Sequence, residues 1–311
     1  MVIICNKSGQ LGNRLFQYAH ILANARENNY CVVNLMFDEY IQFFPALYTI
    51  TTCPNRTRKN QQHYNKVKFK IAYYADRVVF KFFYYTKWYN SFFHSFFDED
   101  INKYNFSKPD FYDLNSREFQ ASAKSKKLVF AYGRFFRDYS ALEKNSAYIK
   151  ELFKPTDLIV NNIKSILNTI RIENELVIGV HMRRGDYKEF ADGRYYYSFH
   201  EYALVLKKIL SNVSYKGKKI AFLLCSNESI PLAAFEGITV YTGTGHLVED
   251  MYALSLCNCI VGPPSTFTMW ASFYGKTPLH QLKKIEYQIC PEDFQLLPPE
   301  IGYNFTYIDR I

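Results

Sequence analysis

The chain has 311 residues, of which 48% are hydrophobic and 22% charged, a composition that excludes a disordered or fibrous protein. Its formal net charge of +9 and pI of about 9.0 favour an anionic partner such as nucleic acid, acidic lipid or a nucleotide. No stretch offers 18 uncharged apolar residues, and the N-terminus MVIICNKSGQ lacks the pattern of a signal peptide, so we expect neither a membrane span nor a leader.

The seven cysteines show no CxxC pair and no zinc-finger spacing. Several fall in apolar, strand-like runs, as buried free thiols do. This usage predicts a reduced, cytoplasmic compartment.

The first 35 residues have a strand–helix–strand pattern. VIIC (2–5) predicts a strand, KSGQLGNR a glycine loop, residues 15–29 a helix with apolar residues at helical spacing, and YCVVNL (30–35) a second strand. Such an opening predicts a parallel sheet covered by helices.

Residues 38–127 alternate polar loops with aromatic, lysine-rich segments and carry no recognisable motif. For residues 66–97 we favour a role in the core of the first domain, with the lysines on its solvated side. The alternative is an interfacial element that makes peripheral contact with the inner membrane face. DED at 98–100 has the DxD form of manganese-dependent transferases, but it follows no recognisable nucleotide-binding strand and is interpreted as solvated charge.

The rest of the chain has a regular α/β pattern. KLVFAYGRFF (127–136) predicts a strand, and KPTD predicts a linker in which Thr156 or Asp157 caps a helix. Strands at 175–180, 218–225, 238–243 and 259–263 then alternate with helices near 197–210, 247–257 and 265–274. We therefore predict an α/β fold with two domains, residues 1–155 and 156–289, with the tail 290–311 joined to the first.

The stretch ELVIGVHMRRGDY (175–187) places two adjacent arginines after a buried strand, at the end where open α/β sheets bind ligands. Period two puts His181 and Arg183 on one face of an extended segment and Arg184 on the other. Because an unpaired arginine beside a core is costly, carboxylates or phosphates should neutralise both. Interdomain ion pairs are the structural alternative. A cell-adhesion role for RGD is disfavoured, because the tripeptide does not cap an exposed hairpin.

Four stretches, in order, resemble the alpha-1,2-fucosyltransferases, glycosyltransferase family 11. They are GQLGNRLFQYA, with Arg14 in place of the commoner glutamine, FAYGRFFRDYSALEKNSAYIKELFKP, VHMRRGDY and EDMYALSLCNCIVGPPSTFTMWAS. The resemblance implies a GT-B fold, two Rossmann-like domains facing a central cleft, with GDP-fucose held mainly by the C-terminal domain. It also implies an inverting glycosyltransferase that moves L-fucose from GDP-fucose to a glycan hydroxyl, as an alpha-1,2 linkage to galactose, with no cofactor or obligatory metal.

The resemblance also implies roles for particular residues. Arg183, whose planar fork matches phosphate oxygens, would clamp the β-phosphate of the donor. Asp250 would accept from guanine N1 and N2, although an acidic first-turn residue of a helix is the plain alternative. Ser265 and Thr266 would open a helix that serves as an anion site. Catalytic roles are expected for Arg183, Asp186 and His181. Further donor contacts are expected from His181, Ser226, Asn227, Gly12, Asn13 and Arg14.

The general base stays open between Asp186, Glu189 and Asp192, and the acceptor between an oligosaccharide and a glycolipid. Another GDP-sugar, another fucosyl linkage and an inactive sugar- or nucleotide-binding protein are the rival functions. A nucleic-acid partner is disfavoured, because the sequence contains no recognition module.

Overall fold

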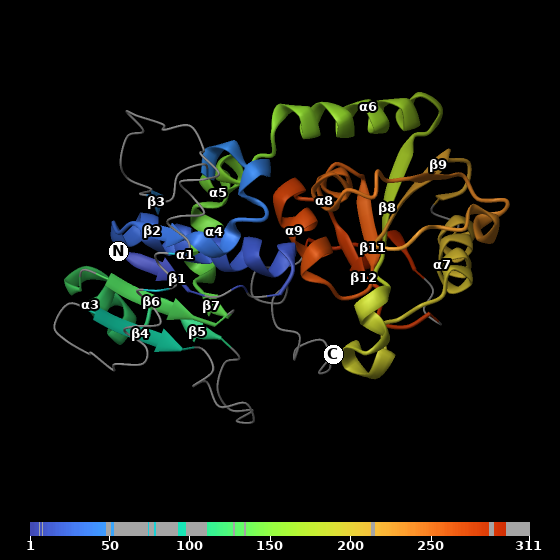
Figure 1. Ribbon diagram of the computed structural model, residues 1–311. Coiled ribbons are helices and arrows are strands. Elements are labelled where there is room, and N and C mark those ends of the chain that lie inside the picture. The colour runs from blue at the N-terminus through green and yellow to red at the C-terminus, as the bar shows by residue number, and fades with distance from the viewer. Residues whose placement is uncertain are drawn as a thin grey trace. The chain divides into compact units, whose positions relative to one another are not determined.

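The computed structural model describes residues 1–5, 7, 9–47, 51–52, 74, 78, 93–97, 111–126, 128–133, 135–212, 215–285 and 289–296. The chain divides into two compact units, Met1–Thr156 and Asp157–Ile311, each with its own sheet (Figure 1). The division falls within the KPTD segment that the sequence marks as a linker.

The first unit is built on a five-stranded sheet of order β3-β2-β1-β6-β4, in which only β3 pairs antiparallel. The same unit also contains a separate two-stranded parallel sheet, formed by β5 and β7. The strands are β1 (Val2–Ile4), β2 (Val32–Asn34), β3 (Thr51–Thr52), β4 (Phe93–Phe97), β5 (Tyr112–Asp113), β6 (Leu128–Tyr132) and β7 (Phe136–Arg137). The helices are α1 (Leu11–Asn28), α3 (Arg117–Ser125), α4 (Tyr139–Lys144) and α5 (Ser146–Leu152).

Helix α1 begins four residues earlier than predicted, so Gly12 and Asn13 belong to its first turn and not to a loop. Glycine and asparagine are weak helix formers. Leu11 and Leu15 are nonetheless fully buried on this helix. Apolar packing therefore outweighs local propensity here.

A buried polar network explains the RDYS part of the second motif. Asp138 caps α4 by accepting from the Ala141 N–H at 3.0 Å, and its other carboxylate oxygen accepts from Asn24 Nδ2 at 2.8 Å. The Asp138 N–H donates to His20 Nδ1 at 3.1 Å. Burial holds the pKa of His20 well below its ordinary value, so this ring is a neutral acceptor. The motif thus joins α1 to α4 and has a structural role.

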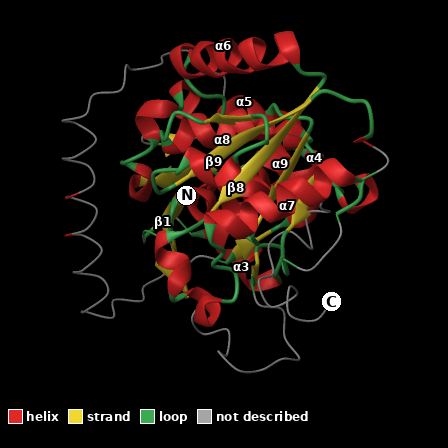
Figure 2. Ribbon diagram, turned by 90° about the vertical axis from the view of Figure 1, so that its right-hand side faces the viewer, coloured by secondary structure: helices red, strands yellow, loops and turns green. Residues whose placement is uncertain are grey.

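The second unit is a five-stranded, all-parallel sheet of order β10-β9-β8-β11-β12. Its strands are β8 (Leu176–Met182), β9 (Ile220–Ser226), β10 (Val240–Thr242), β11 (Cys259–Gly262) and the unpredicted β12 (Leu279–Gln281). Its helices are α6 (Asp157–Glu173), α7 (Phe199–Ser211), α8 (Leu247–Ser255) and α9 (Thr266–Gly275). In Figure 1, α7 lies on one face of this sheet and α8 and α9 on the other, and Figure 2 shows β8 and β9 side by side.

Strand β8 runs two residues further than predicted, and its side chains alternate between the two faces. Ile178, Val180 and Met182 join the apolar core under α7. Gly179 faces α8, where an added Cβ would lie 2.5 Å from a methyl carbon of Leu254. By the same alternation His181 and Arg183 leave the sheet on the α8 and α9 side.

Three predictions need correction or fall outside the described residues. The described part of the C-terminal tail packs on the second unit, because Phe294 belongs to its core and Gln295 bridges to Leu279, so the tail prediction is wrong for residues 290–296. In the stretch 66–97, residues 93–97 form β4, which pairs with β6, and residues 74 and 78 are helical; the rest lies outside the described residues, as does 98–100.

Cys31 is disulfide-bonded, which the prediction of a reduced compartment did not anticipate. Cys225, Cys257, Cys259 and Cys290 do carry free thiols. Pairing depends on tertiary proximity, which sequence spacing does not report. The disulfide removes the argument for a reduced, cytoplasmic compartment. Among the described helices, none is long and apolar enough to cross a membrane.

Candidate active site

The second sheet reverses its strand order between β8 and β11. From β8 the chain goes outward to β9 and β10, then returns to β11 on the other side of β8. Ligands of open parallel sheets bind outside the carboxyl ends of the strands at such a switch point. Here these ends carry His181 and Arg183 from β8 and the Ser265 turn from β11.

Arg183 is buried at this point, with 8% of the residue exposed. Its Nη2 donates to Asp186 Oδ2 at 2.8 Å, and its guanidinium carbon lies 5.6 Å from the centre of the Tyr187 ring. Its Nε, also buried, has no hydrogen-bond partner among the described residues. A buried guanidinium N–H is costly without an acceptor, so the site is suited to an anion.

Arg184 has the opposite environment, in which its guanidinium nitrogens already have acceptors. It donates to Glu228 Oε2 at 2.7 Å, to the Tyr197 carbonyl at 2.6 Å and to the Tyr196 hydroxyl at 2.5 Å. Its guanidinium also packs over the rings of Tyr196 and Phe199. Arg184 is therefore part of the scaffold, and its carboxylate partner is Glu228, while Asp186 pairs with Arg183.

Gly185 makes the turn between these arginines and the short helix η5 (Gly185–Lys188). Its φ of +57° favours glycine, and an added Cβ would lie 2.8 Å from Asn227 Nδ2. Its N–H donates to Glu228 Oε1 at 3.0 Å. Arg184 and Gly185 are thus both hydrogen-bonded to Glu228, at the end of β9.

Ser226 and Asn227, both expected to contact the donor, support the same turn in the structure. Ser226 Oγ donates to the Met182 carbonyl at 3.1 Å, and Asn227 Oδ1 accepts from the Arg184 N–H at 2.9 Å. These contacts position the loop after β8. A donor contact from either side chain remains a prediction.

His181 lies at the end of β8, 4% exposed, with its ring stacked on Phe267 at a centroid distance of 4.6 Å. The strands approach closely here, because an added Cβ on Gly262 would lie 2.7 Å from the His181 carbonyl oxygen. Burial, and secondly the charge of Arg183, lowers the pKa of His181 to about 3. The imidazole is neutral, and its Nδ1 has no partner among the described residues.

Ser265 and Thr266 begin α9, as predicted. Ser265 is the N-cap, and its Oγ accepts from the Phe267 N–H at 3.2 Å. The remaining N–H groups of the first turn and the helix dipole favour an anion at this end. The Tyr187 hydroxyl donates to the Pro264 carbonyl at 2.6 Å, which links this turn to the loop after β8.

Asp250 lies in the first turn of α8, beyond the end of β10, and is 5% exposed. Its Oδ1 accepts from the Thr244 N–H at 2.9 Å, so the carboxylate also orders the loop before α8. Burial raises the pKa of Asp250 to about 6. An added Cβ on Gly243 would lie 2.4 Å from Oδ1, so a larger residue at this position would displace the Asp250 carboxylate.

Gly12, Asn13 and Arg14 belong to the first unit, in the first turn of α1. Arg14 Nη1 donates to Glu39 Oε2 at 2.8 Å, and its Nε donates to the Gly9 carbonyl at 3.0 Å. Arg14 is thus tied to its own domain, and its contact with a donor is untested.

The candidate bases differ in surroundings. Asp186 pairs with Arg183 although its side chain is half exposed. Glu189 and Asp192 are exposed in the segment that follows, where Asp192 has a left-handed φ of +55°. Asp186 is thus the candidate that lies against Arg183.

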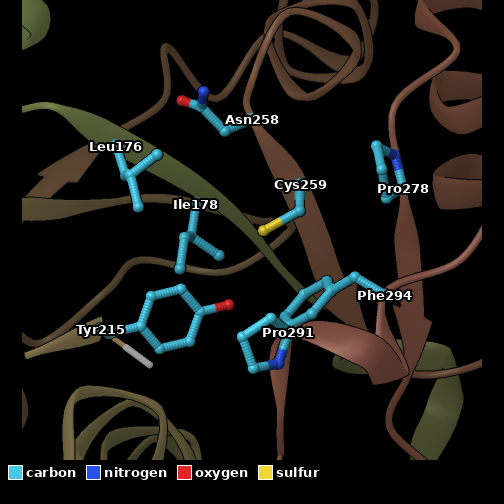
Figure 3. Close-up of a pocket in the computed structure, with 8 residues that line it drawn as sticks. All are labelled: Leu176, Ile178, Tyr215, Asn258, Cys259, Pro278, Pro291 and Phe294. Carbon is cyan, nitrogen blue, oxygen red and sulfur yellow. The ribbon is translucent and has the colours of Figure 1, made fainter. Parts of the chain in front are cut away.

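A cavity of about 220 Å³ opens at the opposite, amino edge of the same sheet (Figure 3). It is lined by the start of β8 at Leu176 and Ile178, the start of β11 at Cys259, and Phe294. Its lining contains no charged side chain. None of the predicted site residues belongs to it, so the cavity is distinct from the candidate active site.

Comparison with known proteins identifies the family. The model of glycosyl transferase family 11 matches residues 105–278, more than half of the chain. The chain belongs to glycosyl transferase family 11. No curated protein matches its sequence significantly.

Solved structures show that this family 11 chain has the GT-B fold that the resemblance implied. A mutant of Arabidopsis thaliana FUT1 in complex with GDP aligns with a TM-score of 0.55 at 13% identity, over 94% of this chain and 72% of that one. The fucosyltransferase NodZ from Bradyrhizobium aligns with a TM-score of 0.53 at 16% identity, over 90% and 94%. NodZ alpha-1,6-fucosyltransferase soaked with GDP-fucose gives 0.51 at 14%, over the same shares. At these identities the likeness establishes the fold alone.

Two residues of the family 11 site were not expected from the sequence: Tyr187 and Phe267. The sequence places Glu228 at the carboxyl end of a predicted strand, beside Ser226 and Asn227, but it does not indicate the pairing of Glu228 with an arginine 44 positions earlier. Tyr187 and Phe267 resemble ordinary core aromatics. Nothing local in the sequence signals their contacts.

Proposed function

We propose that this chain is an inverting fucosyltransferase that moves L-fucose from GDP-fucose to a hydroxyl of a glycan acceptor, forming an alpha-1,2 linkage to galactose. Family membership supports glycosyl transfer. Structural neighbours solved with GDP or soaked with GDP-fucose support the donor. The observation that carries the proposal is the buried Nε of Arg183 at the switch point of the second sheet, which no described residue bonds.

The reaction breaks the bond between the anomeric carbon and the β-phosphate oxygen, and GDP leaves with the electron pair. Arg183 would bind the β-phosphate through its planar fork, where negative charge grows in the transition state. The first turn of α9 would add N–H donors at the same anion. His181 would donate through its Nδ1, which has no partner in the described part of the chain and which can carry the proton of the neutral ring.

The acceptor oxygen attacks the anomeric carbon from the opposite face, and its proton passes to a carboxylate. Asp186 is our first choice for that role, because a diphosphate bound by Arg183 would compete for the guanidinium that now holds it. Asp250, through its second carboxylate oxygen, would select guanine by accepting from N1 and N2. An oligosaccharide or glycolipid is the proposed acceptor.

A donor panel tests the proposal. Nucleotide release from GDP-fucose, GDP-mannose and UDP-galactose should occur with GDP-fucose alone. Release should also survive EDTA, because Arg183 and α9 supply the positive field that a metal would supply. Turnover of GDP-mannose in place of GDP-fucose would assign another sugar. Loss of turnover in EDTA that manganese restores would contradict the arginine clamp.

The linkage is tested separately, on the product. After incubation with a galactose-terminated oligosaccharide, NMR of the product should show fucose joined in the α configuration to O2 of galactose. This is the inverted product of a β-configured donor. A product fucosylated at another hydroxyl would retain the enzyme class and overturn the linkage.

A further inference from the structure

Tyr187 occupies the space between the two loops of the candidate active site. It lies in η5, 6% exposed, with its ring stacked on Phe190 at 4.9 Å between centroids. The Arg183 guanidinium carbon is 5.6 Å from the centre of the same ring. One aromatic ring therefore supports the side chain that we assign to the phosphate.

The hydroxyl of Tyr187 reaches across the switch point. It donates to the Pro264 carbonyl at 2.6 Å, and Pro264 directly precedes Ser265, the N-cap of α9. Burial raises the pKa of Tyr187 to about 12, so the hydroxyl stays protonated and donates at neutral pH. The bond ties the end of β8 to the start of α9.

Hydrogen bonds thus connect the loop that carries Arg183 to two neighbouring segments. Arg184 anchors it to the end of β9 through Glu228, and Tyr187 anchors it to the turn after β11. The Arg184 contacts cannot fix the distance from Arg183 to α9, since they lead to the opposite neighbour of β8. On the α9 side, the β8–β11 pairing and the His181–Phe267 stack hold the end of β8, and the Tyr187 contact extends this attachment to the loop of Arg183 itself.

We propose that Tyr187 is a positioning residue, which sets the spacing between Arg183 and the first turn of α9 so that both meet one diphosphate. The inference rests on the proposed function, because it assigns these two groups to the donor. Transition-state charge is stabilised only by donors already in place, and a displacement of about 1 Å can reduce a rate by about 100-fold.

Tyr187→Phe is the test, because it keeps the ring under Arg183 and removes only the hydroxyl. We expect kcat with GDP-fucose to fall about 10- to 100-fold, while KM for the donor changes less than threefold. Tyr197→Phe is the matched control. Tyr197 is equally buried and also donates to a backbone carbonyl, that of Leu282, at 3.1 Å, but this bond reaches the end of β12 and not the turn before α9.

Amide hydrogen exchange provides a readout that needs no turnover. In Tyr187→Phe, the amides of 183–188 and 264–269 should exchange faster than in the wild type, whereas Tyr197→Phe should leave both segments unchanged. Equal kcat and equal exchange in the two variants would overturn the inference. A wild type that turns over no donor and shows no GDP-dependent protection would overturn the proposed function, and the positioning role with it.

Discussion

The imidazole of His181 stacks on the ring of Phe267, with centroids 4.6 Å apart and planes 21° from parallel. His181 ends β8, and Phe267 lies in the first turn of α9, so the contact covers the switch point of the sheet. The packing excludes water from the imidazole, which is why its pKa falls to about 3.

His181 should make the protein less stable in acid. Its pKa is lower in the folded chain than in the unfolded chain, so the unfolded state binds the proton first as pH falls. The stability present above pH 6.5 is lost progressively toward pH 3, at up to about 1.4 kcal/mol per pH unit from this group. Denaturant unfolding of the wild type and His181→Phe at pH 7, 6 and 5 should show a shallower decline in the variant. The exposed His200→Gln is the control, and parallel curves for wild type and His181→Phe would contradict the prediction.

Asp250 should make nucleotide binding sensitive to pH. Its pKa of about 6 lies above that of an unfolded aspartate, so burial favours the protonated form. Because the folded state binds this proton more tightly, the contribution of Asp250 to the free energy of unfolding rises as pH falls from about 6 to 4. GDP binding should change in the opposite direction, because it needs the carboxylate, and it should weaken about tenfold per pH unit below 6. Asp250→Asn should bind GDP weakly and without this pH dependence. Calorimetry between pH 5 and 8 measures both, and identical pH profiles for wild type and variant would remove Asp250 from base recognition.

The two neighbouring arginines should respond oppositely to substitution by lysine. Arg183→Lys loses the bidentate fork at the phosphate, so activity should fall about 100-fold or more with little change in the unfolding midpoint. Arg184→Lys cannot serve Glu228, Tyr197 and the stacking rings together. It should therefore cost about 1–3 kcal/mol of unfolding free energy. Denaturation and initial rates on both variants decide the matter; equal stability losses would show that Arg183 also belongs to the scaffold.

Gly185→Ala should reduce stability and activity by more than the cost of a left-handed alanine alone. A left-handed residue that gains a Cβ costs about 1–2 kcal/mol. At Gly185 the Cβ would also push the Asn227 amide, which holds the Arg184 N–H. Gly237→Ala, with φ +76° and open space around it, isolates the backbone cost. A larger loss of stability and activity in Gly185→Ala is expected, and equal losses would mean that Asn227 moves freely.

Several features of this chain could be predicted from its sequence because they depend on neighbouring residues. The continuous apolar run 176–180, rich in valine and isoleucine, marks a buried strand, and its end places His181 and Arg183 at a ligand-binding edge. The serine N-cap of α9 is similarly local. The weak points were short or unusual segments, such as β12 and the first turn of α1 with its glycine.

The sequence by itself determined the α/β class, the division within KPTD and the arginine pair after a buried strand, since local periodicity and turn residues carry that information. Only the tertiary structure decided that Arg184 is held by Glu228 and that Arg183 keeps an Nε with no acceptor among the described residues. Strand order brings Glu228 to Arg184 and Phe267 to His181, and it brings Pro264 to Tyr187. These contacts join segments that are far apart in the chain. They form because the whole sheet is buried between helices, and no local sequence pattern encodes that arrangement.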